Sequence, residues 1–329
     1  MILTYKVKHN RDFLEEFQKG WEVISYLSEN PQCRSSKDVK HIGLKSVISN
    51  QILRKYGSNK TLKSVKSLKL PITNQGISFR SETSEIWIPC LKLTLPFKYV
   101  DFEKINYIEI GEEYAYIVCT VPEGTPINPI KTIGVDLNAT GHIVVASCPE
   151  TGEVWKFGKK APHTRKKYQS MRRKISSVES KKKHPKWRKL KTLKHREQNI
   201  CVDINHQISS KLVKLASERN AEIVFEDLKQ IREKTNKKNR FNKTSRRTVN
   251  SWSFYQLRQF VEYKSTCAGV PVRFINPYMT SQKCSRCGEI GIREGKSFTC
   301  PHCGHVDHAD VNAAFNIALT KPADQSIAE

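Results

Sequence analysis

The chain has 329 residues, 38% of them hydrophobic, and can bury one substantial core together with smaller modules. It carries 57 Lys and Arg against 32 Asp and Glu, a formal net charge of +25. This excess goes far beyond what solubility requires and predicts a polyanionic partner. The sequence has no run of eighteen apolar residues and no signal-peptide pattern at its start, which argues against a membrane and favours nucleic acid.

Ten cysteines could form a disulfide framework, but their distribution argues against one. Six are scattered singly, mostly among apolar neighbours, and four stand in two pairs. The pattern therefore predicts a reduced, intracellular protein that binds a metal through the paired cysteines.

The hydrophobic period changes within the first 130 residues. Residues 5–8 predict a strand, and apolar side chains at helical spacing over 13–27 and 39–56 predict two helices. Over 77–118 the period is two, with turn residues between short runs, which is typical of a small β-barrel or sandwich. Prolines then mark a linker that ends near Lys131, where we place a domain boundary.

An acidic residue stands inside the next predicted strand. Residues 132–138 and 143–147 predict a β-hairpin, and Asp136 lies among apolar neighbours on its first strand. A buried carboxylate is costly unless positive charge offsets it, and a capping or turn Asp would stand outside such a run. We therefore predict a functional role for Asp136.

A second apolar strand ends in two carboxylates, Glu226 and Asp227. Either could be a metal ligand, and strand-end carboxylates also cap the helix that follows. The pairing with Asp136 favours the metal role.

Two segments between and after these strands are strongly basic. Residues 156–198 hold eighteen Lys or Arg against two Glu. The alternative is a solvent-exposed helical face, but too few acids are present to neutralise its charge, so the segment predicts helices that contact phosphates. Residues 232–247 hold eight more and predict either a lid that orders on nucleic acid or plain disorder. The predicted nucleic-acid contacts are Arg165, Lys166, Lys167, Arg172, Arg173, Lys174, Arg188, Arg240, Arg246 and Arg247.

A helix over 252–264 and a strand over 270–275 precede the strongest motif of the chain. Its four ligands are Cys284, Cys287, Cys300 and Cys303, in two Cys-x-x-Cys turns twelve residues apart. This spacing predicts one structural Zn²⁺ with a complete tetrahedral shell. The neighbouring His302, His305 and His308 are alternative ligands.

A helix begins directly after the cysteines. Small residues over 313–318 allow close packing, and Asp310 and Asn312 stand at the helix entrance. Asp is favourable there as an N-cap, so the residues alone leave its role open.

Five motifs, in this order, together are specific to one family. They are Gly134-Val135-Asp136, Phe225-Glu226-Asp227-Leu228, Thr280-Ser281-Gln282-Lys283-Cys284-Ser285-Arg286-Cys287-Gly288, Cys300-x-x-Cys303-Gly304 and Asp310-Val311-Asn312-Ala313-Ala314. With them most of the chain resembles the TnpB (OrfB) family of IS200/IS605-type transposons, which shares ancestry with type V CRISPR (Cas12) effectors. The resemblance implies that Asp136, Glu226 and Asp310 are the three acids of a RuvC-type nuclease that uses Mg²⁺. The expected mechanism needs two Mg²⁺ ions.

The resemblance also implies an α+β multidomain fold. An N-terminal wedge-like β-barrel holds an inserted helical module, and an RNase H-like (RuvC) core holds a zinc ribbon. The expected ranges are 1–10 and 61–130 for the barrel, 11–60 for the helical module, 131–275 and 306–329 for the core with a basic helical insertion at 156–220 and a basic loop at 231–250, and 276–305 for the ribbon.

The resemblance implies that the protein is an RNA-guided DNA endonuclease. A transposon-derived guide RNA pairs with double-stranded target DNA, and the protein, a monomer in the ribonucleoprotein, reads a short flanking DNA motif. The expected location is the prokaryotic cytoplasm, at the nucleoid. One departure concerns Phe315, where many relatives carry a basic residue, so a phosphate contact is missing there.

Three alternatives remain. A guided DNA-binding regulator without cleavage is expected to lack an acid, whereas all three are present. A strand-transferring transposase of one common design needs a His-x-His pair, which the chain does not contain. A miniature type V CRISPR effector stays open, although such effectors usually have longer chains.

Overall fold

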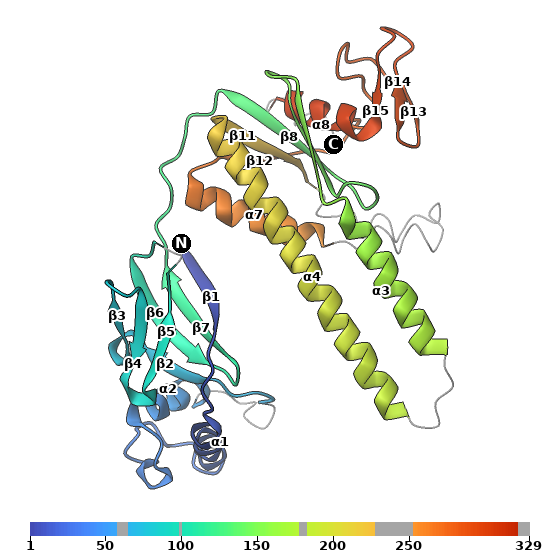
Figure 1. The fold of residues 1–329 in the computed structure, drawn as a ribbon. Coiled ribbons are helices and arrows are strands. Elements are labelled where there is room, and N and C mark those ends of the chain that lie inside the picture. The colour runs from blue at the N-terminus through green and yellow to red at the C-terminus, as the bar shows by residue number, and fades with distance from the viewer. Residues whose placement is uncertain (58–64, 99–100, 178–182, 228–252, 322–329) are drawn as a thin grey trace. The chain divides into compact units, whose positions relative to one another are not determined.

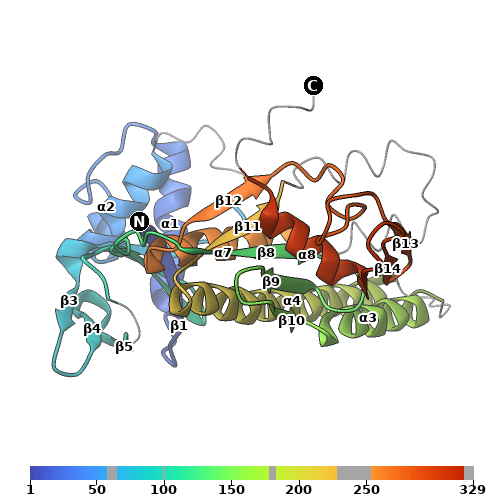
Figure 2. The same ribbon diagram turned by 90° about the horizontal axis from the view of Figure 1, so that it is seen from above.

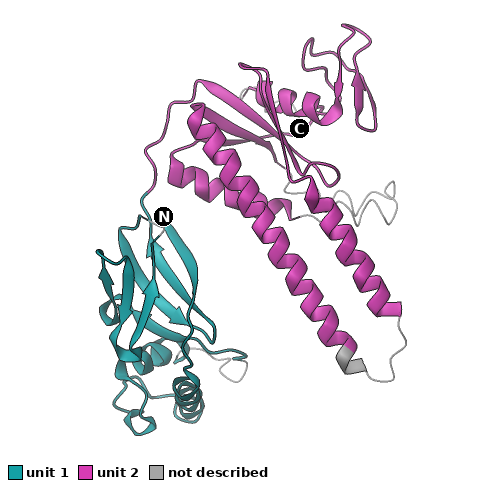
Figure 3. Ribbon diagram, in the orientation of Figure 1, with its two compact units in different colours: residues 1–122 teal, residues 123–329 magenta. Residues whose placement is uncertain are grey.

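The chain mixes helices and strands in two compact units, residues 1–122 and residues 123–329 (Figure 3). The predicted α+β class is thereby confirmed in its coarse form. Among the described helices, none combines the length and apolar character needed to cross a membrane. The computed structural model describes residues 1–57, 65–98, 101–177, 183–227 and 253–321.

The first unit contains two antiparallel sheets (Figure 1). One has four strands, in which alternate side chains of the central strands are buried, as the period of two predicted. Its strands, in spatial order, are β1 (Ile2–Lys8), β7 (Tyr114–Thr120), β6 (Lys104–Ile110) and β2 (Leu70–Thr73). The other sheet contains β3 (Ser78–Arg80), β4 (Glu85–Ile88) and β5 (Leu93–Pro96).

Two helices of the first unit pack on each other and on β2: α1 (Leu14–Glu29) and α2 (Ser46–Tyr56). The second is shorter than the predicted helix over 39–56. Lys40–Ile42 form a single 3-10 turn that ends at Gly43, whose φ of 76° lies in the left-handed region. A left-handed residue cannot continue a helix, so the helix begins anew at Ser46.

The second unit is built on a mixed five-stranded sheet. Strands β8, β11 and β12 are parallel, and β9 and β10 continue the sheet antiparallel from β8. The predicted hairpin is confirmed as β8 and β9. In spatial order the strands are β10 (Glu153–Phe157), β9 (Val144–Cys148), β8 (Lys131–Leu137), β11 (Ala221–Glu226) and β12 (Val272–Ile275).

Helices cover the two faces of this sheet. On one face α4 (Lys183–Glu218) and α7 (Phe254–Ala268) bury the side chains of Val135 and Phe225 in the main core. On the other, α8 (Ala309–Leu319) packs on Val145 and Val224 (Figure 2). The approach is close at Gly134, where an added Cβ would lie 2.2 Å from the Ala314 carbonyl oxygen. Only a glycine fits at this contact between β8 and α8.

Two helices form the basic insertion. The helix α3 (Lys160–Ser177) packs along α4, which runs for 36 residues. Strand β10 precedes them, so the helical insertion begins at Lys160 rather than at residue 156 as predicted. The expected basic loop 231–250, with Arg240, Arg246 and Arg247, lies outside the described residues.

Three short strands precede α8: β13 (Ile292–Glu294), β14 (Ser297–Thr299) and β15 (Val306–His308). Together with the cysteine turns they form a small module with its own core around Phe298.

Residues 123–130, which we expected to belong with the barrel, are bonded to the second unit. The Gly124 N–H donates to the Thr266 carbonyl at 3.0 Å, and the Ile127 N–H donates to the Gly269 carbonyl at 2.9 Å.

Candidate functional site

Strand alternation brings two of the predicted acids to one face of the sheet. Gly134 and Val224 are register partners on the neighbouring strands β8 and β11, and both side-chain positions face α8. Asp136 and Glu226 stand two residues further along each strand and therefore face the same way. The third acid, Asp310, lies in the first turn of α8 itself.

Asp136 and Glu226 each follow one member of the register pair Val135 and Phe225, so the two acids are neighbours across the parallel strands. Burial raises the pKa of Asp136 to about 7, and the charge of Glu226 and then of Asp310 adds to the rise. Burial also raises the pKa of Glu226, against a hydrogen bond from Thr280 and the charge of Arg293. Like charges held in a poorly solvated site favour the binding of a cation.

Asp310 is 2% exposed, and cations of the small three-stranded module hold both of its oxygens. Arg293 Nη2 lies 3.2 Å from Oδ1, and Lys296 Nζ lies 2.5 Å from Oδ2. Lys296 also donates to Asn138 Oδ1 at 3.2 Å, and Asn138 Nδ2 donates to Asp136 Oδ2 at 2.7 Å. A continuous polar path thus joins Asp136 to Asp310.

The N-cap role that the sequence left open for Asp310 is wrong. The residue that caps α8 is His308, whose Nδ1 accepts from the Asp310 N–H at 3.3 Å. The Asp310 carboxylate is therefore not used to cap its own helix.

The structure also separates Glu226 from Asp227. Asp227 Oδ1 lies 3.0 Å from Arg258 Nη1, an ion pair with α7. Glu226, by contrast, is electrostatically coupled to Asp136. Of these two neighbours, Glu226 therefore belongs to the carboxylate cluster.

The carboxylate cluster (Asp136, Glu226 and Asp310) fits a hard divalent cation. Its donors are carboxylate oxygens, which Mg²⁺ prefers. Burial and the repulsion between the carboxylates favour a bound cation that would neutralise them. Among the described residues, the four cysteines are the group of potential metal ligands whose donor atoms all lie within 4.8 Å of one another. The three acids do not approach one another as closely as this. In this arrangement Asp310 is directed at Arg293 and Lys296.

The four cysteine sulfurs of the second candidate centre lie within 4.8 Å of one another. Cys284 Sγ and Cys303 Sγ are 3.6 Å apart, and Cys287 Sγ and Cys300 Sγ are 3.5 Å apart. These distances exceed a disulfide bond, and tetrahedral Zn–S bonds of about 2.3 Å would separate sulfurs by about 3.8 Å. The set therefore fits Zn²⁺, with no histidine in the group.

The cysteine turns are bonded to α8 through two asparagines. Asn312 is fully buried, accepts from the Ser285 N–H at 2.9 Å and donates to the Lys283 carbonyl at 2.7 Å. Asn316 Nδ2 donates to the Thr280 carbonyl at 2.8 Å. The cysteine module thereby fixes the helix that carries Asp310.

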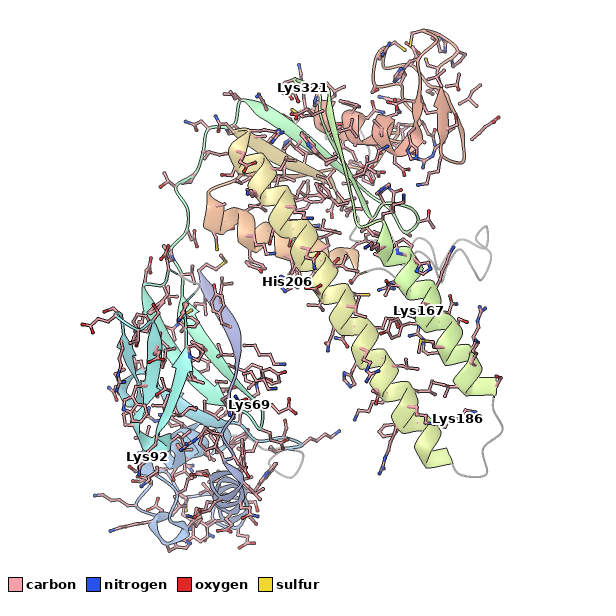
Figure 4. The ribbon with its side chains drawn as sticks, viewed as in Figure 1. Lys69, Lys92, Lys167, Lys186, His206 and Lys321 are labelled. Carbon is pink, nitrogen blue, oxygen red and sulfur yellow. The ribbon has the colours of Figure 1, made fainter. Side chains whose placement is uncertain are left out.

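The predicted nucleic-acid contacts at 165–174 and Arg188 lie on α3 and α4. Lys166, Lys167, Arg173, Lys174 and Arg188 are exposed. Figure 4 labels Lys167 on α3 and Lys186 on α4. The side chain of Arg172 instead pairs with Glu197 of α4 and joins the two helices.

Sequence reasoning missed the polar partners of the acids. Asn138 stands two residues after Asp136 and Thr280 opens the first cysteine motif, but nothing in the sequence assigned them to Asp136 and Glu226. Arg293 and Lys296 lie between the two cysteine turns, and their basic character next to a metal motif was the available signal.

Fold and site together define an α+β protein that combines a partly buried carboxylate cluster with a four-cysteine module that could hold a metal ion. The Cas12f1-like TNB domain family matches residues 254–317, from α7 through the cysteine module to α8. In structure, the chain resembles Cas12f1 in a Cas12f1-sgRNA-target DNA complex, with a TM-score of 0.59 over 94% of this chain and 80% of that one, at 16% identity. This similarity shows a shared fold.

Relatives in sequence show the family. The TnpB-like protein MJ0751 of Methanocaldococcus jannaschii is 32% identical over 71% of this chain and 76% of its own length. Cas12f1 of Sulfoacidibacillus thermotolerans is 37% identical over 43% of this chain, which spans 32% of that longer protein. A protein of Escherichia coli K12 named "Putative RNA-guided DNA endonuclease InsQ" is 25% identical over 74% of this chain and 63% of its own length. The chain belongs to the TnpB family, which is related to Cas12.

Proposed function

We propose that this protein is an RNA-guided DNA endonuclease of RuvC type that hydrolyses DNA phosphodiesters with Mg²⁺. The observation that carries the proposal is the placement of Asp136, Glu226 and Asp310 on one face of a sheet and on the helix that covers it. The relatives named as RNA-guided or CRISPR-associated DNA endonucleases support the same reaction.

The chemistry follows from the residues of the site. Bound divalent cations, two in the mechanism we propose, would supply an activated water and stabilise the leaving oxygen. Asp136, Glu226 and Asp310 would hold them through carboxylate oxygens. Arg293 and Lys296 place positive charge beside the same carboxylates, where the phosphate of a DNA strand must approach.

The units divide the work of the proposed nuclease. We assign the strands of residues 1–10 and 61–122 to a wedge-like barrel and 11–60 to a helical module that reads the flanking DNA motif. The second unit supplies the RuvC-type core, and its helices α3 and α4 present exposed cations to the paired guide and target. The protein acts as a monomer with one guide RNA.

The cysteine module is a structural zinc ribbon in this proposal. Four thiolates complete the tetrahedral shell and leave no open position for a reacting water. Its hydrogen bonds to Asn312 and Asn316 position Asp310 at the carboxylate cluster.

The test uses the ribonucleoprotein as purified. Sequencing of the RNA that copurifies should give one discrete, structured species, and DNA matching its guide segment should be cut in Mg²⁺. Asp136→Ala should abolish cutting and preserve DNA binding. Random RNA fragments, or undiminished cleavage by the variant, would refute the proposal.

A second candidate is a miniature type V CRISPR effector. It is favoured by the match of residues 254–317 to the Cas12f1-like domain. The same RNA sequencing separates the two, since a CRISPR repeat in the copurified RNA indicates the effector and a transposon-end sequence indicates the transposon nuclease.

A further inference from the structure

A cavity of about 310 Å³ opens in the second unit where β10 meets α3. Its floor is apolar, formed by Phe157, Ala161, Ile204 and Ile208, of which Ala161 and Ile208 are buried. Its rim is cationic and polar: Lys156, Lys159, Lys160, Lys211, His142 and Gln207. The four lysines come from β10, from the turn after it, from α3 and from α4, and His142 comes from the β8–β9 turn.

The charge of this rim is not neutralised within the part of the chain that the structure describes. No acidic side chain lines the cavity, and none of its four lysines makes an ion pair with a described residue. The pKa of His142 reflects this excess. Burial lowers it first, and the charges of Lys156 and Lys159 lower it further. Uncompensated cations around a cavity favour an anionic ligand.

The backbone at the cavity adds to this field. Helix α3 begins at Lys160 with no acid in its first turn, so its N-terminal end presents unneutralised positive potential. The preceding Gly158 has a φ of 76°, and an added Cβ would lie 2.9 Å from side-chain atoms of Ile143 and Ile208. A glycine is required for the tight turn that brings Lys156, Lys159 and Lys160 to one rim.

The cavity lies on the face of the sheet that α4 covers. Phe157, Ala161 and Ile208 belong to the main core on that face, whereas Asp136 faces α8. His142 stands in the turn between β8, which carries Asp136, and β9, so a ligand in the cavity would contact the turn that follows this strand.

We propose that this cavity binds one sugar–phosphate unit of a nucleic-acid strand, with the sugar on the apolar floor and the phosphate among Lys156, Lys159, Lys160 and Lys211. The inference rests on the proposed function, because it assigns the site to a strand of the guided complex. Guide RNA and target DNA share this backbone chemistry. The cavity holds one strand of the guided complex at the edge of the sheet formed by β10, where α3 and α4 meet it.

The experiment compares a double variant, Lys156→Ala with Lys211→Ala, with a matched control, Lys214→Ala. Lys214 lies on the same helix as Lys211 but pairs with Glu218 at 3.7 Å. Two arms are measured against salt: binding of the copurified RNA to the full chain, and binding of matched double-stranded DNA to the ribonucleoprotein. Each lost phosphate contact lowers the slope of log affinity against log salt by about 0.7 to 0.9.

The double variant should lose about 0.7 to 0.9 from the slope in one arm, the contribution of one phosphate, and the affected arm identifies the strand. Lys214→Ala should leave both slopes unchanged. A double variant with Arg at both positions should retain the wild-type slope, and melting curves should show that all variants fold. Unchanged slopes in both arms for a folded double variant would overturn the cavity as a binding site.

The two proposals fail separately. If wild-type ribonucleoprotein cuts matched DNA and the slopes do not change, the cavity proposal is wrong and the nuclease stands. If the slope falls as expected but wild-type protein cuts no matched DNA, the cavity binds nucleic acid and guided cleavage is wrong.

Discussion

Lys296 Nζ lies 2.5 Å from Asp310 Oδ2, so a cation of the cysteine module occupies an oxygen that the proposed nuclease needs for a metal ligand. The same ammonium donates to Asn138, which holds Asp136. Lys296 therefore links the first and the last acid of the cluster and competes with a metal for one of them.

Lys296→Ala is expected to lower the Mg²⁺ concentration at half-maximal cleavage severalfold, because Asp310 loses a competing partner. Mg²⁺ titrations of cleavage by the ribonucleoprotein measure the effect. Lys283→Ala, which removes an exposed lysine of the same module, serves as the control and should leave the requirement unchanged. A higher Mg²⁺ requirement in Lys296→Ala would show that Lys296 assists metal binding.

Glu226 and Asp227 are adjacent carboxylates with different surroundings, which makes them a matched pair. Glu226→Gln should abolish cleavage, because a neutral amide cannot replace a charged ligand. Asp227→Asn should retain most cleavage and mainly weaken the ion pair with Arg258. Single-turnover cleavage of matched DNA separates the two. The reverse order of activities would assign Asp227 to the cluster.

Cys300→Ser should lower bound zinc below one ion per chain and unfold the region around 276–305. It should also reduce cleavage, because Asn312 and Asn316 lose the partners that position α8. Elemental analysis and hydrogen exchange measure the two effects. Cys267→Ser, at a cysteine outside the cluster, is the control. Full zinc content in Cys300→Ser would contradict the four-cysteine site.

The ion pair between Glu153 and Arg219 makes a pH-dependent contribution to stability. Its two N–H···O contacts, 2.8 and 2.9 Å, join the end of α4 to β10 and lower the pKa of Glu153 from its usual 4.5 to about 2. The folded state holds this proton less tightly than the unfolded state, so the stabilisation is present above pH 4.5 and is lost as pH falls towards 2.

Glu153→Gln should therefore lower the melting temperature at pH 7 and have a smaller effect at pH 3. Thermal melts across this range measure the difference. Glu218→Gln removes a more exposed acid of a 3.7 Å pair on α4 and should change the melting temperature less at both values. An effect of Glu153→Gln that grows at low pH would contradict the assigned ion pair.

Local patterns carried most of the sequence predictions that the structure bears out. The apolar runs around Asp136 and before Glu226 depend only on neighbouring residues, and so do the two Cys-x-x-Cys turns. The α+β class and the family followed from these motifs. The particular ranges assigned to the barrel, the nuclease core and the nucleic-acid contacts stay predictions.

Contacts between distant segments could not be predicted in this way. The pairing of Lys296 with Asp310 and of Thr280 with Glu226 depends on how the cysteine module docks on α8. Strand β10 was missed because its alternation is short: Trp155 and Phe157 face the core and Val154 is exposed, over only five residues before the basic helices. The single turn at Lys40–Ile42 was predicted as part of a helix because the spacing of apolar residues gives no sign of the left-handed conformation at Gly43.

The order of the acids along the chain has a consequence for biosynthesis. Asp136 and Glu226 leave the ribosome before the cysteine module, and Asp310 follows it, on a helix held by Asn312 and Asn316. A nascent chain therefore lacks its third carboxylate until all four cysteines of the module have been translated. A chain interrupted before α8 therefore has an incomplete carboxylate cluster, however well its first two acids are placed.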